Sequence, residues 1–206
     1  MTASPAAVLL AAVFFATVAF AATVAVGEWP LNASARPSAR QMGQMLVTIG
    51  AAAIGAFAAS RRLTPAELLA SAVLVGALAA ASVPASPRST RSLAIVAAAF
   101  AIVAVAAMLD GMWWTLGGAA VASAPFFGTV PFVRDRRTSM FDGCVAAIAG
   151  IALGGPASAI VVLFCACLAA IGYVKFARRP SSCARFAPYI AGFTLAAVLV
   201  QVALVA

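Results

Sequence analysis

The chain has 206 residues, of which 65% are hydrophobic and only 9% charged, and its mean hydropathy is +1.10. A soluble globular domain carries about 25% charged residues, so the composition argues against an ordinary soluble domain and predicts an integral membrane protein. The net charge of +8 does not indicate nucleic acid, because the basic residues lie in short connections between apolar segments. There they act as topology signals and lipid-headgroup contacts, so membrane lipids are the expected partners.

Residue types also exclude several kinds of site. The sequence contains no histidine, which rules out histidine-based catalytic triads and histidine metal sites. Its four cysteines form no Cys-x-x-Cys pair, and most lie in apolar segments, so we interpret them as ordinary buried cysteines. They are Cys144, Cys165, Cys167 and Cys183. We expect neither a metal nor a cofactor.

Apolar stretches predict eight helices in one domain that covers residues 1–206. Seven stretches are long enough to span a bilayer, judged against roughly 20 residues per crossing. They are 6–26, 42–60, 66–83, 92–109, 113–133, 157–174 and 187–206. An eighth, 142–155, is short and ends at Gly154-Gly155-Pro156, which would stop one helix and start the next. The predicted fold is all-α, a polytopic membrane protein with about eight transmembrane helices.

The first segment resembles a secretory signal only in part. Residues 19–21 are similar to a cleavage site, but no Lys or Arg precedes the apolar run. We therefore expect a retained first helix.

Loop charges predict the orientation, because cytoplasmic loops are enriched in Lys and Arg. If the first helix starts outside, eleven of the thirteen basic residues are cytoplasmic and only Arg61 and Arg62 are outside. The eleven are Arg36, Arg40, Arg88, Arg91, Arg134, Arg136, Arg137, Lys175, Arg178, Arg179 and Arg185. The prediction is a bacterial inner-membrane protein with both termini outside.

Three of the five acidic residues have ordinary structural interpretations. Glu28 lies beside Trp29 at an expected membrane interface. Asp135 lies in a basic loop, 134–137, where it balances charge locally. Glu67 belongs to Thr64-Pro65-Ala66-Glu67, which is typical of a capping box with proline at the first helical position.

Asp110 lies in Met108-Leu109-Asp110-Gly111-Met112, a predicted turn between two spanning helices. One helix separates it from Asp142, so the two carboxylates should face opposite sides of the membrane. They could meet only if segment 113–133 does not cross, for example as a re-entrant segment broken at Gly117-Gly118 or Pro125.

Asp142 is the most informative residue, because it lies where the basic loop runs into an apolar segment. An ionisable group at such a position is a functional-site hypothesis by default. The alternative is that it caps a helix beginning at Gly143, where a carboxylate interacts favourably with the helix dipole.

From about Asp142 to the C-terminus, the order of features resembles the type IV prepilin peptidase family, membrane aspartyl proteases that process pilin leader peptides. Ser139-Met140-Phe141-Asp142 corresponds to the family's Gly-x-Gly-Asp motif, with Ser139 and Phe141 in place of the glycines. It is followed by a Leu-Gly break at Leu153-Gly154. A basic loop, 175–179, and a segment opening the last helix, 185–192, are also similar to the family.

The resemblance implies a membrane aspartic endopeptidase acting on a pilin-like peptide. It would use Asp142 as a catalytic carboxylate and would need a second carboxylate on the same face. The family's first aspartate should lie in the stretch 80–91, which contains no acid. Asp110 is the candidate partner if it can reach the site.

Two other functions are compatible with the sequence. One is a non-catalytic scaffold or assembly subunit of a pilus or secretion system, which could also form a homo-oligomer. The motif Gly150-x-x-x-Gly154 suggests this function, because it permits close helix approach. A small-solute transporter could use breaks at Gly117-Gly118 and Gly154-Gly155. Gln201 is one of the few polar residues deep in a predicted span.

Overall fold

A computed structural model of the chain describes residues 4–26, 39–60, 65–82, 90–133, 135–176 and 186–205. Over these residues the structure is all-helical, which confirms the predicted class. In chain order the helices there are α1 (Pro5–Val26), α2 (Ala39–Ser60), α3 (Pro65–Ser82), α4 (Thr90–Leu109), α5 (Trp113–Thr129), α6 (Arg136–Ala152), α7 (Pro156–Phe176) and α8 (Ala187–Val205).

Two of the described helices are long and apolar enough to cross a membrane by length and composition. They comprise Pro5–Val24 of α1 and Pro156–Phe176 of α7. Shorter apolar helical segments occur in four others, at Gln44–Ser60, Ala70–Ala81, Leu93–Leu109 and Ala187–Gln201.

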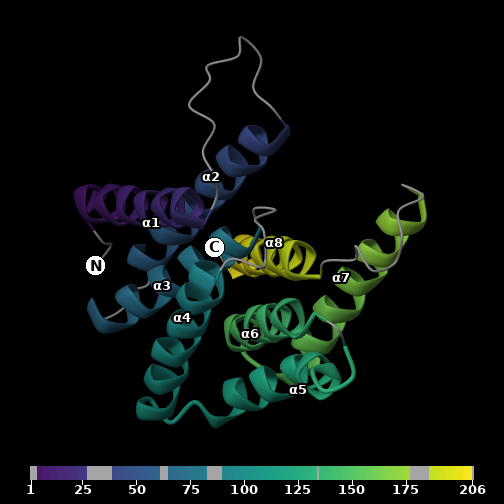
Figure 1. Ribbon diagram of the computed structural model, residues 1–206. Helices are drawn as coiled ribbons and strands as arrows, with labels where there is room; N and C mark the ends of the chain where they lie inside the picture. The colour runs from purple at the N-terminus through teal and green to yellow at the C-terminus, as the bar shows by residue number, and fades with distance from the viewer. Residues whose placement is uncertain are drawn as a thin grey trace.

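Helix α6 lies at the centre of the C-terminal half, where it contacts α3, α4, α5, α7 and α8. In Figure 1 the end of α8 that follows α7 lies beside α7, and its other end points toward α3 and α4. Helices α1 and α2 form an adjoining pair that packs on α3. The last turns of α7 extend away from the other helices in Figure 1.

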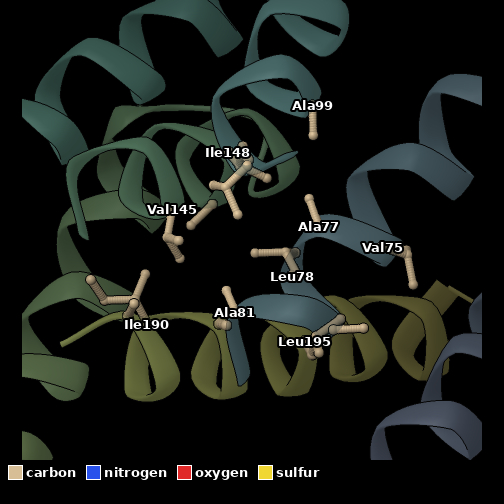
Figure 2. Packing of buried hydrophobic residues seen from close by; sticks show 14 of the residues in the cluster. Val75, Ala77, Leu78, Ala81, Ala99, Val145, Ile148, Ile190 and Leu195 are labelled. Carbon is tan, nitrogen blue, oxygen red and sulfur yellow. The ribbon is translucent and has the colours of Figure 1, made fainter. Parts of the chain in front are cut away.

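The core is built mainly from small side chains. Most of its buried apolar residues are alanines, and Leu78, Ile148 and Ile190 are among the few large side chains that are fully buried. Figure 2 shows these three residues converging from α3, α6 and α8. Small residues allow helix backbones to approach closely, which increases van der Waals contact between them.

Helices α5 and α6 run antiparallel and approach each other closely. A Cβ atom added to Gly118 would lie 2.7 Å from the carbonyl oxygen of Gly150, so the two backbones touch. Close approach was predicted for Gly150 together with Gly154, but Gly154 has nothing near its Cβ position. Its φ of 74° instead reverses the chain after α6, because glycine adopts the left-handed conformation without strain.

Helix α5 is continuous from Trp113 to Thr129. The break considered at Gly117-Gly118 or Pro125 is therefore not present, and Pro125 lies inside the helix. The helix ends earlier than the predicted 113–133, and Val130 to Phe132 form a turn instead.

Candidate functional site

The first turns of α6 correct the predicted start of that helix. Helix α6 begins at Arg136, so Asp142 lies in its second turn and does not cap it. Asp135 is the N-cap: its Oδ1 accepts a hydrogen bond from the Thr138 amide at 3.3 Å, and its Oδ2 accepts one from the Thr138 hydroxyl at 2.8 Å. Asp135 thus satisfies an otherwise unpaired first-turn amide, a more specific role than the charge balance expected for it.

Asp142 caps a different helix. Only 4% of its surface is exposed, and its Oδ1 accepts a hydrogen bond from the Ala187 amide, at the first residue of α8, at 2.9 Å. Ala187 is also buried. A hydrogen bond to a charged group contributes about 1.5–3 kcal/mol, and the positive end of the α8 dipole adds to it. Asp142 therefore joins α6 to α8 across 45 residues of sequence.

Two hydroxyl groups bind the C-terminal end of α5, and one of them belongs to Ser139, one helical turn before Asp142 in α6. The buried Ser139 hydroxyl donates to the Phe126 carbonyl at 2.7 Å, and the Thr129 hydroxyl donates to the same oxygen at 2.8 Å. The two hydroxyl oxygens are 3.1 Å apart. These bonds satisfy a carbonyl at the end of α5, because the last carbonyls of a helix have no partner within it.

Aromatic contacts join α5 and α7 to the start of α8. The rings of Phe126 and Phe186 are 5.8 Å apart, which joins the end of α5 to the residue before α8. The rings of Tyr173 and Tyr189 are 6.3 Å apart, which joins the end of α7 to the first turn of α8.

Asp110 lies at the opposite end of the α5–α6 pair. It follows the last residue of α4, and Gly111, with φ of 68°, reverses the chain there. The Met112 amide donates to the Ala107 carbonyl at 2.9 Å and the Gly111 amide to the Met108 carbonyl at 3.1 Å, which is the Schellman pattern. Asp110 is exposed in this turn, as its interpretation as a turn residue predicted.

The 17 residues of α5 separate the two candidate catalytic carboxylates. At 1.5 Å of rise per residue, they correspond to about 25 Å. The contact of Phe127 with Gly143 places the Asp142 end of α6 at the C-terminal end of α5, whereas Asp110 precedes its N-terminal end. The structure does not bring Asp110 and Asp142 together.

The other acidic residues are placed only in part. Asp135 precedes Asp142 by seven residues, which is about 10 Å along the helix. Helix α3 starts at Pro65, as the capping motif predicted. Thr64, the Glu67 side chain, Glu28 and most of the stretch 80–91 lie outside the described residues.

The arrangement around Asp142 can hold three helices in register. Among the residues that the structure describes, no three His, Cys, Asp or Glu side chains gather as they would around a metal ion. Sequence reasoning missed Ser139, Thr129 and Ala187 as partners in this region. The spacing of Asp135, Thr138, Ser139 and Asp142 was the available signal, because residues three, four and seven apart share one helix face.

Comparison with known proteins adds no relationship: no family model, curated protein or solved structure matches the chain significantly.

Proposed function

We propose that the chain is a polytopic membrane protein that works as a non-catalytic scaffold or assembly subunit. The membrane part of this proposal is supported by an inverted distribution of side-chain size. Large apolar residues face outward on several helices, including Leu10, Ile49, Ile102 and Phe164, which are each at least 54% exposed, whereas alanines fill the core. Lipid can cover such an apolar surface, whereas its exposure to water would be unfavourable.

The two longest apolar segments support the same conclusion. Only 17% of each apolar window in α1 and α7 is buried within the protein. An apolar helix that forms the core of a soluble protein would be mostly buried, because its burial drives folding. In a bilayer the exposed faces of α1 and α7 would contact acyl chains instead.

The difference in charge between the two ends of the C-terminal helices supports one orientation in the membrane. Arg136, Arg137 and Lys175 are exposed at the end that holds Asp142, whereas Trp113 and Trp114 are exposed at the other. Cationic residues favour the cytoplasmic side, and tryptophan favours either interface. We place the Asp142 end in the cytoplasm, which is the orientation that puts both termini outside.

The observation that carries the scaffold role is the bond between the Asp142 carboxylate and the Ala187 amide. It gives the buried carboxylate a structural role, in holding α6 and α8 together. Asp135 has another structural role, and Asp110 is at the far end of α5. A scaffold needs such fixed helix positions to present its outer faces to the membrane segments of partners, which on the family resemblance would be pilin-like.

A peptidase that cleaves pilin-type leader peptides is the second candidate function. Its support is the position of Asp142 in the second turn of α6, one helical turn after Ser139, in the helix that begins with the exposed Arg136 and Arg137. In the family it resembles, the aspartate lies near the start of a helix. Such a peptidase would require a second carboxylate at this end.

Substitution of Asp142 by Asn separates the two candidates. The Asn side chain retains an oxygen that can accept from Ala187, so a scaffold should keep its assembly function, but an aspartic peptidase would lose its acid-base group. Asp142→Leu should abolish both the assembly function and any peptidase activity. In cells that express a pilin precursor, cleavage that disappears in Asp142→Asn, with unchanged protein level, would contradict the scaffold proposal. Assembly that survives Asp142→Asn and fails in Asp142→Leu supports it.

A further inference from the structure

The start of α8 is joined to each of the three preceding helices by one contact. The Phe126–Phe186 ring contact brings the end of α5 there, and the Asp142–Ala187 hydrogen bond brings α6. The Tyr173–Tyr189 ring contact joins α7 to the first turn of α8, and α7 then extends away from the other helices to Phe176. We call this end of the helices the basic end, defined by the exposed residues Arg136, Arg137 and Lys175 that flank it.

The charge of this end is strongly asymmetric. The connections between α5 and α6 and between α7 and α8 also contain Arg134, Arg178, Arg179 and Arg185 in their sequences. At the opposite end, residues 110–112 and 153–155 contain no Lys or Arg and one acid, Asp110. An orientation signal requires only an excess of cations, and the exposed Arg136, Arg137 and Lys175 can in addition attract anions.

The first turn of α6 places its two arginines unfavourably with respect to the helix dipole. Arg136 and Arg137 occupy the positive end of the helix, and no acidic residue lies in its first turn. Cations are stabilising near a helix C-terminus and destabilising near an N-terminus. The N-cap Asp135 offsets one charge, so an external anion near the arginines would lower the free energy further.

Exposed apolar side chains lie beside these cations. Phe132 is 88% exposed just before α6, Phe176 is 90% exposed at the end of α7, and Met140 is 41% exposed one turn after Arg136. A phospholipid offers an anionic headgroup and an apolar chain at adjacent depths, whereas an acidic peptide offers mainly charge. The combination of cations and apolar side chains therefore fits a lipid better.

We propose that the basic end binds anionic phospholipids, with Arg136, Arg137 and Lys175 contacting the headgroup phosphates and Phe132 and Phe176 lying against the upper acyl chains. This inference rests on the proposed membrane insertion. Bound anionic lipid would neutralise the charge of Arg136 and Arg137 at the start of α6. The association would weaken with salt, because salt screens the contacts between cations and phosphates.

The test is the preference of the purified full chain for spin-labelled phosphatidylglycerol over spin-labelled phosphatidylcholine in mixed vesicles. Wild type should prefer phosphatidylglycerol, and Arg136→Gln with Arg137→Gln should reduce the preference roughly fivefold for each charge removed. The matched control is Arg61→Gln with Arg62→Gln, which removes the same charge from a connection predicted on the other side. It should leave the preference unchanged, and high salt should reduce that of the wild type.

The outcomes distinguish a failure of lipid binding from a failure of the proposed membrane insertion. Equal affinity for both lipids, or equal losses in the two double variants, would overturn the inference while leaving membrane insertion intact. Release of the chain from native membranes by alkaline carbonate would overturn membrane insertion itself. Soluble polyglutamate that binds wild type tightly, in the absence of any lipid preference, would assign the basic end to an acidic protein partner and refute the lipid proposal.

Discussion

The Oδ1 atom of Asp142 lies 2.9 Å from the backbone nitrogen of Ala187, and both residues are almost fully buried. A side chain in the second turn of α6 thus serves as the N-terminal hydrogen-bond acceptor of α8. This bond allows α8 to start in the interior of the protein, where an unpaired amide would be costly.

Removal of the Asp142 carboxylate should destabilise the protein. Asp142→Ala leaves the buried Ala187 amide without this acceptor, which costs about 1–3 kcal/mol, and Asp142→Asn should cost less because it keeps an acceptor oxygen. Unfolding in detergent at a fixed lipid content measures the difference. Equal stability of wild type and Asp142→Ala would mean that the bond does not hold α8 in place.

Two adjacent glycines in α5 should respond in opposite directions to substitution by alanine. A methyl group at Gly118 meets the Gly150 carbonyl, so Gly118→Ala should destabilise by about 1–3 kcal/mol. Gly117 has nothing within 4 Å of its Cβ position. Gly117→Ala should therefore stabilise the protein by roughly 0.5–1 kcal/mol, because alanine lowers the backbone entropy of the unfolded chain.

Thermal unfolding of the two single variants under identical conditions tests this pair, and each variant serves as the control for the other. Two shifts of the same sign would contradict the close packing of α5 against α6.

The loss of Asp135 should weaken the first turn of α6. Asp135→Ala removes the acceptor of the Thr138 amide, and N-cap losses cost about 0.5–2 kcal/mol. Hydrogen exchange should become faster at residues 136–139 and remain unchanged at the end of α6. Asp110→Ala is the control: it lies in an exposed turn formed by backbone hydrogen bonds, so it should change hydrogen exchange neither at residues 136–139 nor at the end of α6.

Single cysteines introduced into a cysteine-free background test the orientation. Arg137→Cys should react with a membrane-impermeant maleimide only after the membrane is opened, and Met112→Cys should react in intact cells, because the two exposed residues lie at opposite ends of α5 and α6. The reversed labelling pattern would place the Asp142 end outside and would contradict the predicted topology.

Most helices could be predicted from the sequence because their apolar runs have a characteristic length and are bounded by turn residues. The end of α6 and the start of α7 at Pro156 follow directly from Gly154-Gly155-Pro156. The start of α6 was missed because residues 136–139 are basic and polar, as is typical of a loop. The capping pattern of Asp135 with Thr138 was the better indicator.

The candidate site was only half predictable. The importance of Asp142 follows from its lone charge in an apolar context, but its partner is a backbone amide 45 residues away. Every non-proline residue carries such an amide, so no residue type marks Ala187 in advance. The hydrogen bonds of Ser139 and Thr129 were not predicted for a related reason, since their shared acceptor is the Phe126 carbonyl.

The backbone contact between Gly118 and Gly150 has a consequence for the order of assembly. No side chain needs to adopt a particular rotamer there, so the contact forms without loss of side-chain conformational entropy. The connection between α5 and α6 is also short, which makes loop closure inexpensive. We therefore expect the α5–α6 hairpin to form before α8 docks, and pulsed hydrogen exchange should detect protection of the hairpin before that of Ala187. Earlier protection of Ala187 would contradict this order.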